Sequence, residues 1–178
     1  MVTGVAPPSF GDPDLKTYTN CFEEGNTDLL YLENAEVIDW NQGGNQKVLK
    51  ISPGGKVIIG NTFYSVSGGD EARYMVSSKL YATGQEGAKI TVITYRGSPD
   101  QVAVQSEWSL RPDDWLELQN LDDSSMLTGK FICSNTTASP DSVTTGSYES
   151  NADTLEIQNT GDVDVYIDCI HVEFDSAI

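Results

Sequence analysis

The chain has 178 residues, of which 38% are hydrophobic, so it can form one domain with a substantial core, and no apolar run approaches the length of a membrane span. Its 27 acidic and 10 basic residues give a formal net charge of −17. This charge disfavours nucleic acid, anionic lipid and uronic-acid polymers as partners, because binding them needs clustered Lys and Arg, whereas a neutral ligand or Ca²⁺ fits it well.

The first 16 residues differ in character from the rest. The stretch "VTGVAPPSFGDPD" is rich in Pro and Gly and has no hydrophobic periodicity, which is typical of a tether. We therefore predict a linker over residues 1–16 and one folded domain over residues 17–178.

The remaining chain is patterned for strands. No window of about ten residues sustains helical periodicity, and apolar residues instead alternate with a period of two. The separators, such as "SPGG", "SGGDEA" and "NTGD", are turn-forming. These features predict an all-β fold, a β-sandwich (jelly roll) of two antiparallel sheets, with a long loop from Cys133 to Ala152. The expected strands are 28–40, 46–52, 56–60, 62–67, 73–81, 88–95, 102–108, 115–120, 126–133, 153–159 and 163–174.

Nucleophilic and metal chemistry find little support in the sequence. The single histidine, His171, lies in the last expected strand, and there is neither a G-x-S-x-G motif nor a Cys–His pair. Cys21, Cys133 and Cys169 have no C-x-x-C spacing, which argues against structural zinc. Their spacing is compatible with one disulfide and a thiol, or with three buried thiols. A catalytic carboxylate pair stays open, but several of the acids lie in turns, where turn chemistry explains them.

The tryptophans are more informative. Trp108 and Trp115 flank "SLRPDD", and symmetric pairing about this turn would place both rings on one face. The same register mixes apolar and charged residues on that face, so a bulge or a different pairing is the alternative. In "WLELQ" the two leucines favour the core, which leaves Trp115, Glu117 and Gln119 facing outward.

An outward Trp beside amides and carboxylates suits a sugar, because a flat ring covers the apolar face of a pyranose while polar groups bind its hydroxyls. For each Trp the alternative is packing in the core or in a loop. The candidate ligand-binding residues are Trp115, Trp108, Trp40, Gln105, Glu117, Gln119, Arg111 and Tyr95.

The order of motifs resembles the carbohydrate-binding modules of families 4, 9 and 22. "NCFEEG" is similar to their early N-x-x-F-E-x-G motif, "GGNQKVLKIS" to a glycine followed by a short basic and apolar strand, and "GKFICSN" to a later strand. "RYMVSSKLYATGQEGAKITVITY" resembles the central hairpin, and "GDVDVYIDCIHVEF" the closing strand. The resemblance spans about residues 18 to 175, nearly the whole domain.

This resemblance implies a structural Ca²⁺ that joins the first strand to the last, with Glu23 and Asp168 as ligands and backbone carbonyls completing the shell. The chain departs from the family by having Cys169 where a second Asp is common, and Cys21 before the Phe. We therefore hypothesise that Cys21 and Cys169 form a disulfide.

The resemblance also implies function. We expect a non-catalytic module, secreted as part of a larger glycoside hydrolase and monomeric within it, with no nucleic-acid or membrane partner. Its expected ligand is a neutral β-linked plant cell-wall polysaccharide (β-glucan, xyloglucan, glucomannan or xylan), with the β-glucan class favoured. The alternatives are a protein-interaction or adhesion sandwich and a small jelly-roll glycan hydrolase or lyase.

Overall fold

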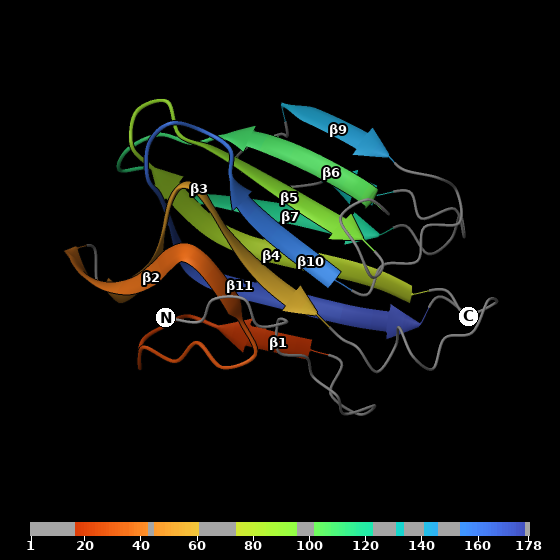
Figure 1. The fold of residues 1–178 in the computed structure, drawn as a ribbon, viewed down its shortest axis with the longest axis horizontal. Helices are drawn as coiled ribbons and strands as arrows, with labels where there is room; N and C mark the ends of the chain where they lie inside the picture. Colours follow the sequence, from red (N-terminus) through yellow and green to blue (C-terminus); the bar gives the residue numbers. More distant parts are fainter. Residues whose placement is uncertain are drawn as a thin grey trace.

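The computed structural model describes residues 17–42, 45–60, 74–95, 102–122, 131–133, 141–145 and 154–176. These residues form strands joined by turns (Figure 1). In chain order the strands are β1 (Thr17–Asn20), β2 (Tyr31–Gln42), β3 (Asn45–Gly60), β4 (Tyr74–Gly84), β5 (Lys89–Tyr95), β6 (Val102–Ser109), β7 (Leu116–Asp122), β8 (Phe131–Cys133), β9 (Ser142–Thr145), β10 (Thr154–Asn159) and β11 (Val165–Ser176).

The strands pair antiparallel along the path β8-β7-β4-β11-β3-β10-β5-β6-β9, with β1 on β11 and β2 on β3. The path folds over at β3. The first half of β3 pairs with β11, where Leu49 lies opposite Ile167. The second half of β3 pairs with β10, where Val57 lies opposite Ile157. We call β8, β7, β4, β11 and β1 the first layer, and β10, β5, β6 and β9 the second layer. The β2–β3 hairpin crosses from one to the other.

The crossing has a local cause. The β2–β3 register shifts between Glu33 and Ala35, and Gly54 in the facing segment has a φ of +79°. Gly55 lies so close to β2 that a Cβ atom there would be 2.5 Å from the Asn34 carbonyl oxygen. The "SPGG" stretch, which we expected to separate two strands, therefore bends one long strand.

The core lies between the layers because alternate residues of each strand point inward. Leu80 of β4 and Leu118 of β7 share one buried cluster with Ile90 of β5 and Leu155 of β10. The prediction of an all-β sandwich of antiparallel sheets is confirmed.

Most of the expected strands agree with the structure. Two elements were not predicted: β1, and β9, which lies inside the predicted loop from Cys133 to Ala152. The expected strand at 62–67 and the tether at 1–16 fall outside the described residues. Within the described ranges, no helix has the length and apolar character needed to cross a membrane.

Candidate functional site

Three aromatic side chains that are distant in sequence meet on the outer side of the first layer. Trp40 comes from β2, Tyr166 from β11, and Trp115 immediately precedes β7. The Trp40 ring lies 4.8 Å from Tyr166 and 5.7 Å from Trp115, centroid to centroid, and meets Trp115 edge-on at 76°. All three rings are only partly buried, so the cluster is open to a ligand.

A cleft of about 250 Å³ adjoins this cluster. Its walls come from the cluster, the end of β4, the β4–β5 turn and the β6–β7 connection, and are Trp40, Thr83, Gly84, Gln85, Glu86, Pro112, Asp113 and Tyr166. The β6–β7 connection is held in place, because the Thr83 hydroxyl donates to the Arg111 carbonyl at 2.7 Å. The Arg111 Nε donates to Asp114 at 2.8 Å, which further fixes the turn.

The outer face of the first layer continues from the cluster as a polar surface. Glu117 of β7 lies opposite Tyr81 of β4, and Gln119 lies opposite Lys79. The Lys79 ammonium is 2.7 Å from a Glu117 carboxylate oxygen. This hydrogen bond lowers the pKa of Glu117 and raises that of Lys79. Glu117 also accepts from Tyr81 at 3.3 Å and from Gln119 at 3.2 Å, so these four residues form one network.

A second group of polar residues lies where β1 leads into the next loop. The Asp168 Oδ1 atom is buried and has no hydrogen-bond partner in the part of the chain that the structure describes. Burial raises the pKa of Asp168, and the nearby charge of Glu23 raises it further. Among the described residues, no set of three or more His, Cys, Asp or Glu side chains gathers to bind a metal. Two carboxylates that interact electrostatically, one of them with an unsatisfied oxygen, nevertheless suit a hard cation whose shell would be completed by carbonyl oxygens.

Comparisons with known proteins give the fold. No protein-family model matches the sequence, and no characterised protein matches it as a relative. Among solved structures, the CBM22-1 xylan-binding domain of Xyn10C from Paenibacillus barcinonensis is similar, with a TM-score of 0.52 and 13% identity over 88% of this chain and 92% of that one. The chain has the fold of a carbohydrate-binding module. An exo-β-agarase is also similar, with a TM-score of 0.53 and 10% identity, over 85% of this chain and 24% of the agarase.

In this carbohydrate-binding-module fold, five of the predicted ligand-binding residues lie at or beside the cleft. Trp40 and Trp115 belong to the aromatic cluster, Arg111 to the adjoining turn, and Glu117 and Gln119 to the polar surface next to it. The sequence did not predict Tyr166 as a member of the aromatic cluster, because its motif "YIDC" points to the neighbouring Asp168 as a metal ligand. It also missed the cleft residues of the β4–β5 turn, which have the composition of an ordinary turn.

Trp108 requires a correction. It is 0% exposed and packs in the core opposite Ile90, so it cannot reach a ligand. Of the two possibilities for the "SLRPDD" turn, the structure has the different pairing, since β6 pairs with β5 and β9 while β7 pairs with β4 and β8. The turn therefore carries the chain from one layer to the other, and Trp108 and Trp115 lie in different layers.

Tyr95 and Gln105 lie elsewhere, on the outer side of the second layer. Tyr95 is 4% exposed, and its hydroxyl donates to Glu156, which is 1% exposed, at 3.4 Å. This burial contradicts the prediction that Tyr95 contacts ligand. Gln105 is partly buried opposite Ile93 and shares no surface with the aromatic cluster. Of the predicted residues, those on the outer side of the first layer are therefore the more accessible ones.

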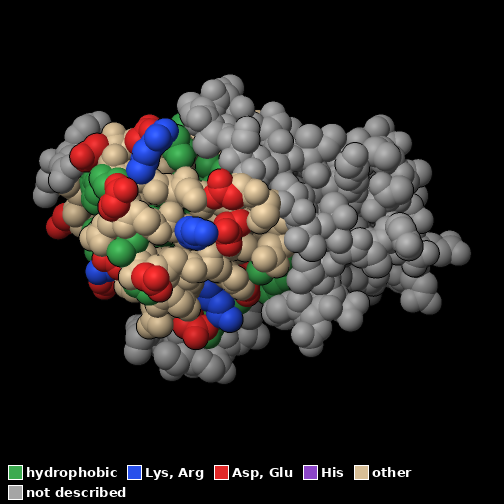
Figure 2. All heavy atoms as spheres, turned by 90° about the horizontal axis from the view of Figure 1, so that it is seen from above, with side chains coloured by type: hydrophobic (Ala, Val, Ile, Leu, Met, Phe, Trp, Pro, Cys, Tyr) green, Lys and Arg blue, Asp and Glu red, His purple; other side chains and the backbone are tan. Residues whose placement is uncertain are grey.

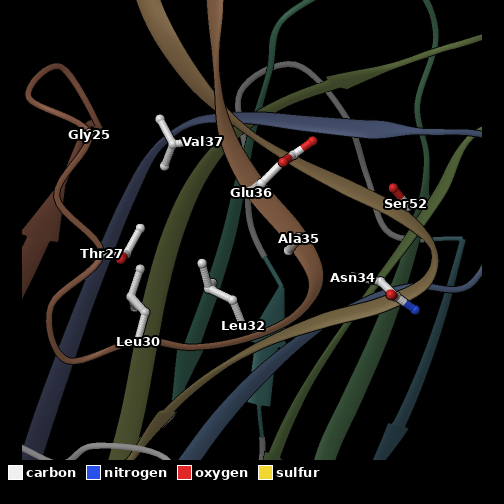
Figure 3. Close-up of a pocket in the computed structure, with 9 residues that line it drawn as sticks. All are labelled: Gly25, Thr27, Leu30, Leu32, Asn34, Ala35, Glu36, Val37 and Ser52. Carbon is white, nitrogen blue, oxygen red and sulfur yellow. The ribbon is translucent and has the colours of Figure 1, made fainter. Parts of the chain in front are cut away.

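A larger cavity of about 500 Å³ lies between β2 and the loop that precedes it (Figure 3). Figure 3 shows Leu30, Leu32, Ala35 and Val37 beside it, and none of the described residues that line it is aromatic. A glycan site needs rings and convergent polar groups. The smaller cleft meets this requirement better.

Charge on the described surface is mixed. In Figure 2 the acidic and basic side chains of the described part are interspersed on the face shown. Lysines pair with acids, as at Lys47–Asp39 (2.7 Å), Lys56–Glu33 (3.6 Å) and Lys89–Glu107 (3.5 Å). Such paired lysines do not offer the clustered free cations that an anionic polymer needs.

Proposed function

We propose that this protein is a non-catalytic carbohydrate-binding module that binds a neutral β-linked polysaccharide at the Trp40–Tyr166–Trp115 cluster. The observation that supports this most directly is the partly exposed aromatic cluster beside a polar cleft. Aromatic faces stack on the apolar faces of pyranose rings. The amide of Gln85 and the carboxylates of Glu86 and Asp113 are suited to bind sugar hydroxyls.

Charge and shape support the proposed class of ligand. A net charge of −17 favours a neutral glycan over a uronic-acid polymer. An open cleft covers only part of a sugar chain, so affinity should be modest. We favour the β-glucan class as the ligand. We also favour a role in which the secreted module holds an appended glycoside hydrolase at its substrate and so raises the effective concentration of the enzyme there.

Affinity electrophoresis through gels containing β-glucan, xyloglucan, glucomannan or xylan tests this function. Retardation by at least one neutral β-linked glycan is expected, with β-glucan the strongest. Trp40→Ala and Trp115→Ala should each abolish it. Tyr31→Ala is the matched control, because Tyr31 is a partly buried aromatic of β2 that lies opposite Ile58, next to the second layer. If Tyr31→Ala loses binding while Trp40→Ala and Trp115→Ala keep it, the site lies next to the second layer and the proposal is contradicted.

The proposal includes a structural Ca²⁺ held by Glu23 and Asp168. The buried, unpartnered Asp168 oxygen supports it, because a cation would supply the missing interaction. The ion would neutralise two close carboxylates and tie the β1–β2 loop to β11. Calcium should raise the melting temperature of the chelator-treated protein, and Glu23→Gln should remove this effect. An unchanged melting temperature would contradict the calcium site without affecting the glycan site.

An enzymatic function is the second candidate, because Glu86 and Asp113 line the same cleft. Two carboxylates across a bound sugar are the minimum for glycoside hydrolysis. Both are exposed here, whereas catalytic groups work in sites that exclude water. Release of reducing sugar from the glycan panel, lost in Glu86→Gln, would establish hydrolysis. If no glycan is bound or cleaved, a protein-interaction or adhesion role is favoured instead.

A further inference from the structure

The disulfide lies at the same place as the carboxylate pair. Cys21 and Cys169 are bonded across 148 residues of sequence, which agrees with the hypothesis drawn from the sequence. Cys21 precedes Glu23 by two residues, and Cys169 directly follows Asp168. The bond therefore links the two short segments that carry the two carboxylates.

The strand ladder is interrupted at this point. The pairing of β11 with β4 shifts register between Ile167 and Cys169, which leaves Asp168 without a partner on β4. On its other side, β11 pairs with β3 up to Ile167 and with β1 from Ile170 onward. Asp168 and Cys169 thus occupy a gap between β3 and β1. There the disulfide, and not a ladder hydrogen bond, connects β11 to the chain that follows β1.

The loop that carries Glu23 is anchored by Phe22 in the core and by hydrogen bonds to side chains of β1. Phe22 is buried in the core, and Asn20 accepts from the Phe22 amide at 2.8 Å and donates to the Asn26 carbonyl at 2.6 Å. Glu23 itself is exposed. Among the described contacts, the Cys21–Cys169 bond is the one that ties this loop directly to the segment of Asp168.

The two carboxylates oppose this arrangement. Like charges repel, and the Cys21–Cys169 bond brings together the two short segments that carry Glu23 and Asp168. A covalent bond can hold such a pair together without a cation, and a cation can hold it together without the bond. Each constraint lowers the free energy that the other must supply to hold the two carboxylates together. This is the condition for positive coupling between the disulfide and the bound cation.

We propose that the Cys21–Cys169 disulfide is the positioning element of the cation site, so that its reduction weakens calcium binding and bound calcium resists its reduction. This inference rests on the calcium site of the proposed function. In the redox step a dithiol gives two electrons and two protons to the S–S bond, which yields two thiols, and the dithiol becomes a disulfide. The chain thereby gains a site whose cation affinity reports the redox state of its surroundings.

Calorimetric titration with CaCl₂ tests the first half. The double variant Cys21→Ser/Cys169→Ser should bind calcium about tenfold more weakly than the oxidised wild type, a typical size for coupled sites. Cys133→Ser is the matched control, because it removes a thiol and leaves the bond intact, and its affinity should be unchanged. Near-ultraviolet circular dichroism establishes beforehand that each variant is folded.

A second measurement uses the wild-type protein, so it holds even if the double variant does not fold. The protein is equilibrated with mixtures of reduced and oxidised dithiothreitol, with calcium or with a chelator. By reciprocity, calcium should raise the reduced-to-oxidised ratio needed for half-reduction by about the same tenfold factor. Asp168→Asn should abolish this shift.

The outcomes separate the two ideas. If the oxidised wild type binds no calcium, the calcium site fails and this inference fails with it. If calcium binds equally to oxidised and reduced protein and leaves the half-reduction ratio unchanged, the site stands and the coupling is overturned. Tenfold coupling in both measurements supports both.

Discussion

Asn20 and Phe22 show at the scale of single residues how the "NCFEEG" loop is shaped. Phe22 has a φ of +60°, a conformation that costs a non-glycine residue about 1–2 kcal/mol. Its ring is 1% exposed, and burying a Phe side chain gains about 1.5–3 kcal/mol, which offsets the cost. The Asn20 side chain bonds the loop backbone on both sides of Phe22. Glu23 is thereby held beside β11.

Replacing Asn20 should destabilise the protein more than replacing its neighbour Asn26. Asn20→Ala leaves the Phe22 amide and the Asn26 carbonyl without their partner, so we expect a loss of about 2 kcal/mol in the free energy of unfolding. Asn26→Ala removes one exposed bond to the Asp28 amide, and its cost should not exceed about 1 kcal/mol. Urea denaturation measures both. Equal losses would show that the Asn20 bonds do not shape the loop.

At the scale of elements, the β2–β3 hairpin determines the sandwich, because it belongs to both layers. Its bend depends on two adjacent glycines with different roles. Gly54 has positive φ and open space where a Cβ would lie, whereas Gly55 is packed against the backbone of β2. The first needs conformational freedom and the second needs the absence of a side chain.

These roles predict opposite tolerances. Gly54→Asn should change the free energy of unfolding by no more than about 1 kcal/mol, because Asn adopts left-handed conformations readily. Gly55→Ala should cost about 2–3 kcal/mol, because its Cβ would be 2.5 Å from the Asn34 oxygen and 2.8 Å from that of Glu33. Chemical denaturation of the two variants compares them. If Gly55→Ala were as stable as the wild type, β2 and β3 could move apart at this point at little cost in free energy.

The burial of Asp168 where β11 is interrupted also affects how the stability of the fold depends on pH. A carboxyl whose pKa is raised by folding stabilises the folded state below its unfolded pKa, and this contribution is lost as pH rises through the folded pKa. At neutral pH, ionised Asp168 therefore destabilises the metal-free fold. With chelator present, Asp168→Asn should be more stable than the wild type at neutral pH, and this advantage should vanish below the ordinary aspartate pKa of 3.8.

Calcium should reverse the order of stabilities at neutral pH, because the amide of the variant is a poorer calcium ligand than the carboxylate. Urea midpoints with chelator and with calcium measure the reversal. Asp162→Asn, at an exposed turn position, serves as control and should behave like the wild type in both. If Asp168→Asn is less stable than the wild type in chelator at neutral pH, burial and Glu23 do not destabilise the ionised carboxyl.

For the whole molecule, local sequence patterns predicted the strands but not how they assemble. Alternation in "WLELQ" correctly directed Trp115 and Glu117 outward, because the period of a strand is a local property. Pro112 correctly indicated a turn, but a turn does not specify whether the next strand pairs with the previous one or crosses to the other layer. Trp108 was misplaced for this reason. Tyr166 joins Trp40 only through strand pairing across most of the chain.

The charge of the whole molecule predicts how salt affects binding. The net charge is −17, and binding to a neutral glycan through rings and hydroxyls involves no ion release. Between about 0.1 M and about 1 M NaCl, where the Debye length falls from about 10 Å to about 3 Å, affinity should stay within about twofold. Affinity gels measure this, with polygalacturonate as the anionic comparison. A tenfold loss of affinity in salt would indicate an electrostatic ligand.

The pairing of β1 with β11 has a mechanical consequence. Thr17 lies opposite Glu173, so chain preceding the domain and chain following β11 leave from the same end of this ladder. Tension between these two connections would peel the ladder open pair by pair, from Thr17 toward Asn20, and then meet the Cys21–Cys169 bond. Beyond it the load runs through covalent sulfur. The aromatic cluster and its cleft lie in the ring of chain that this bond closes, outside the covalent path that carries the load.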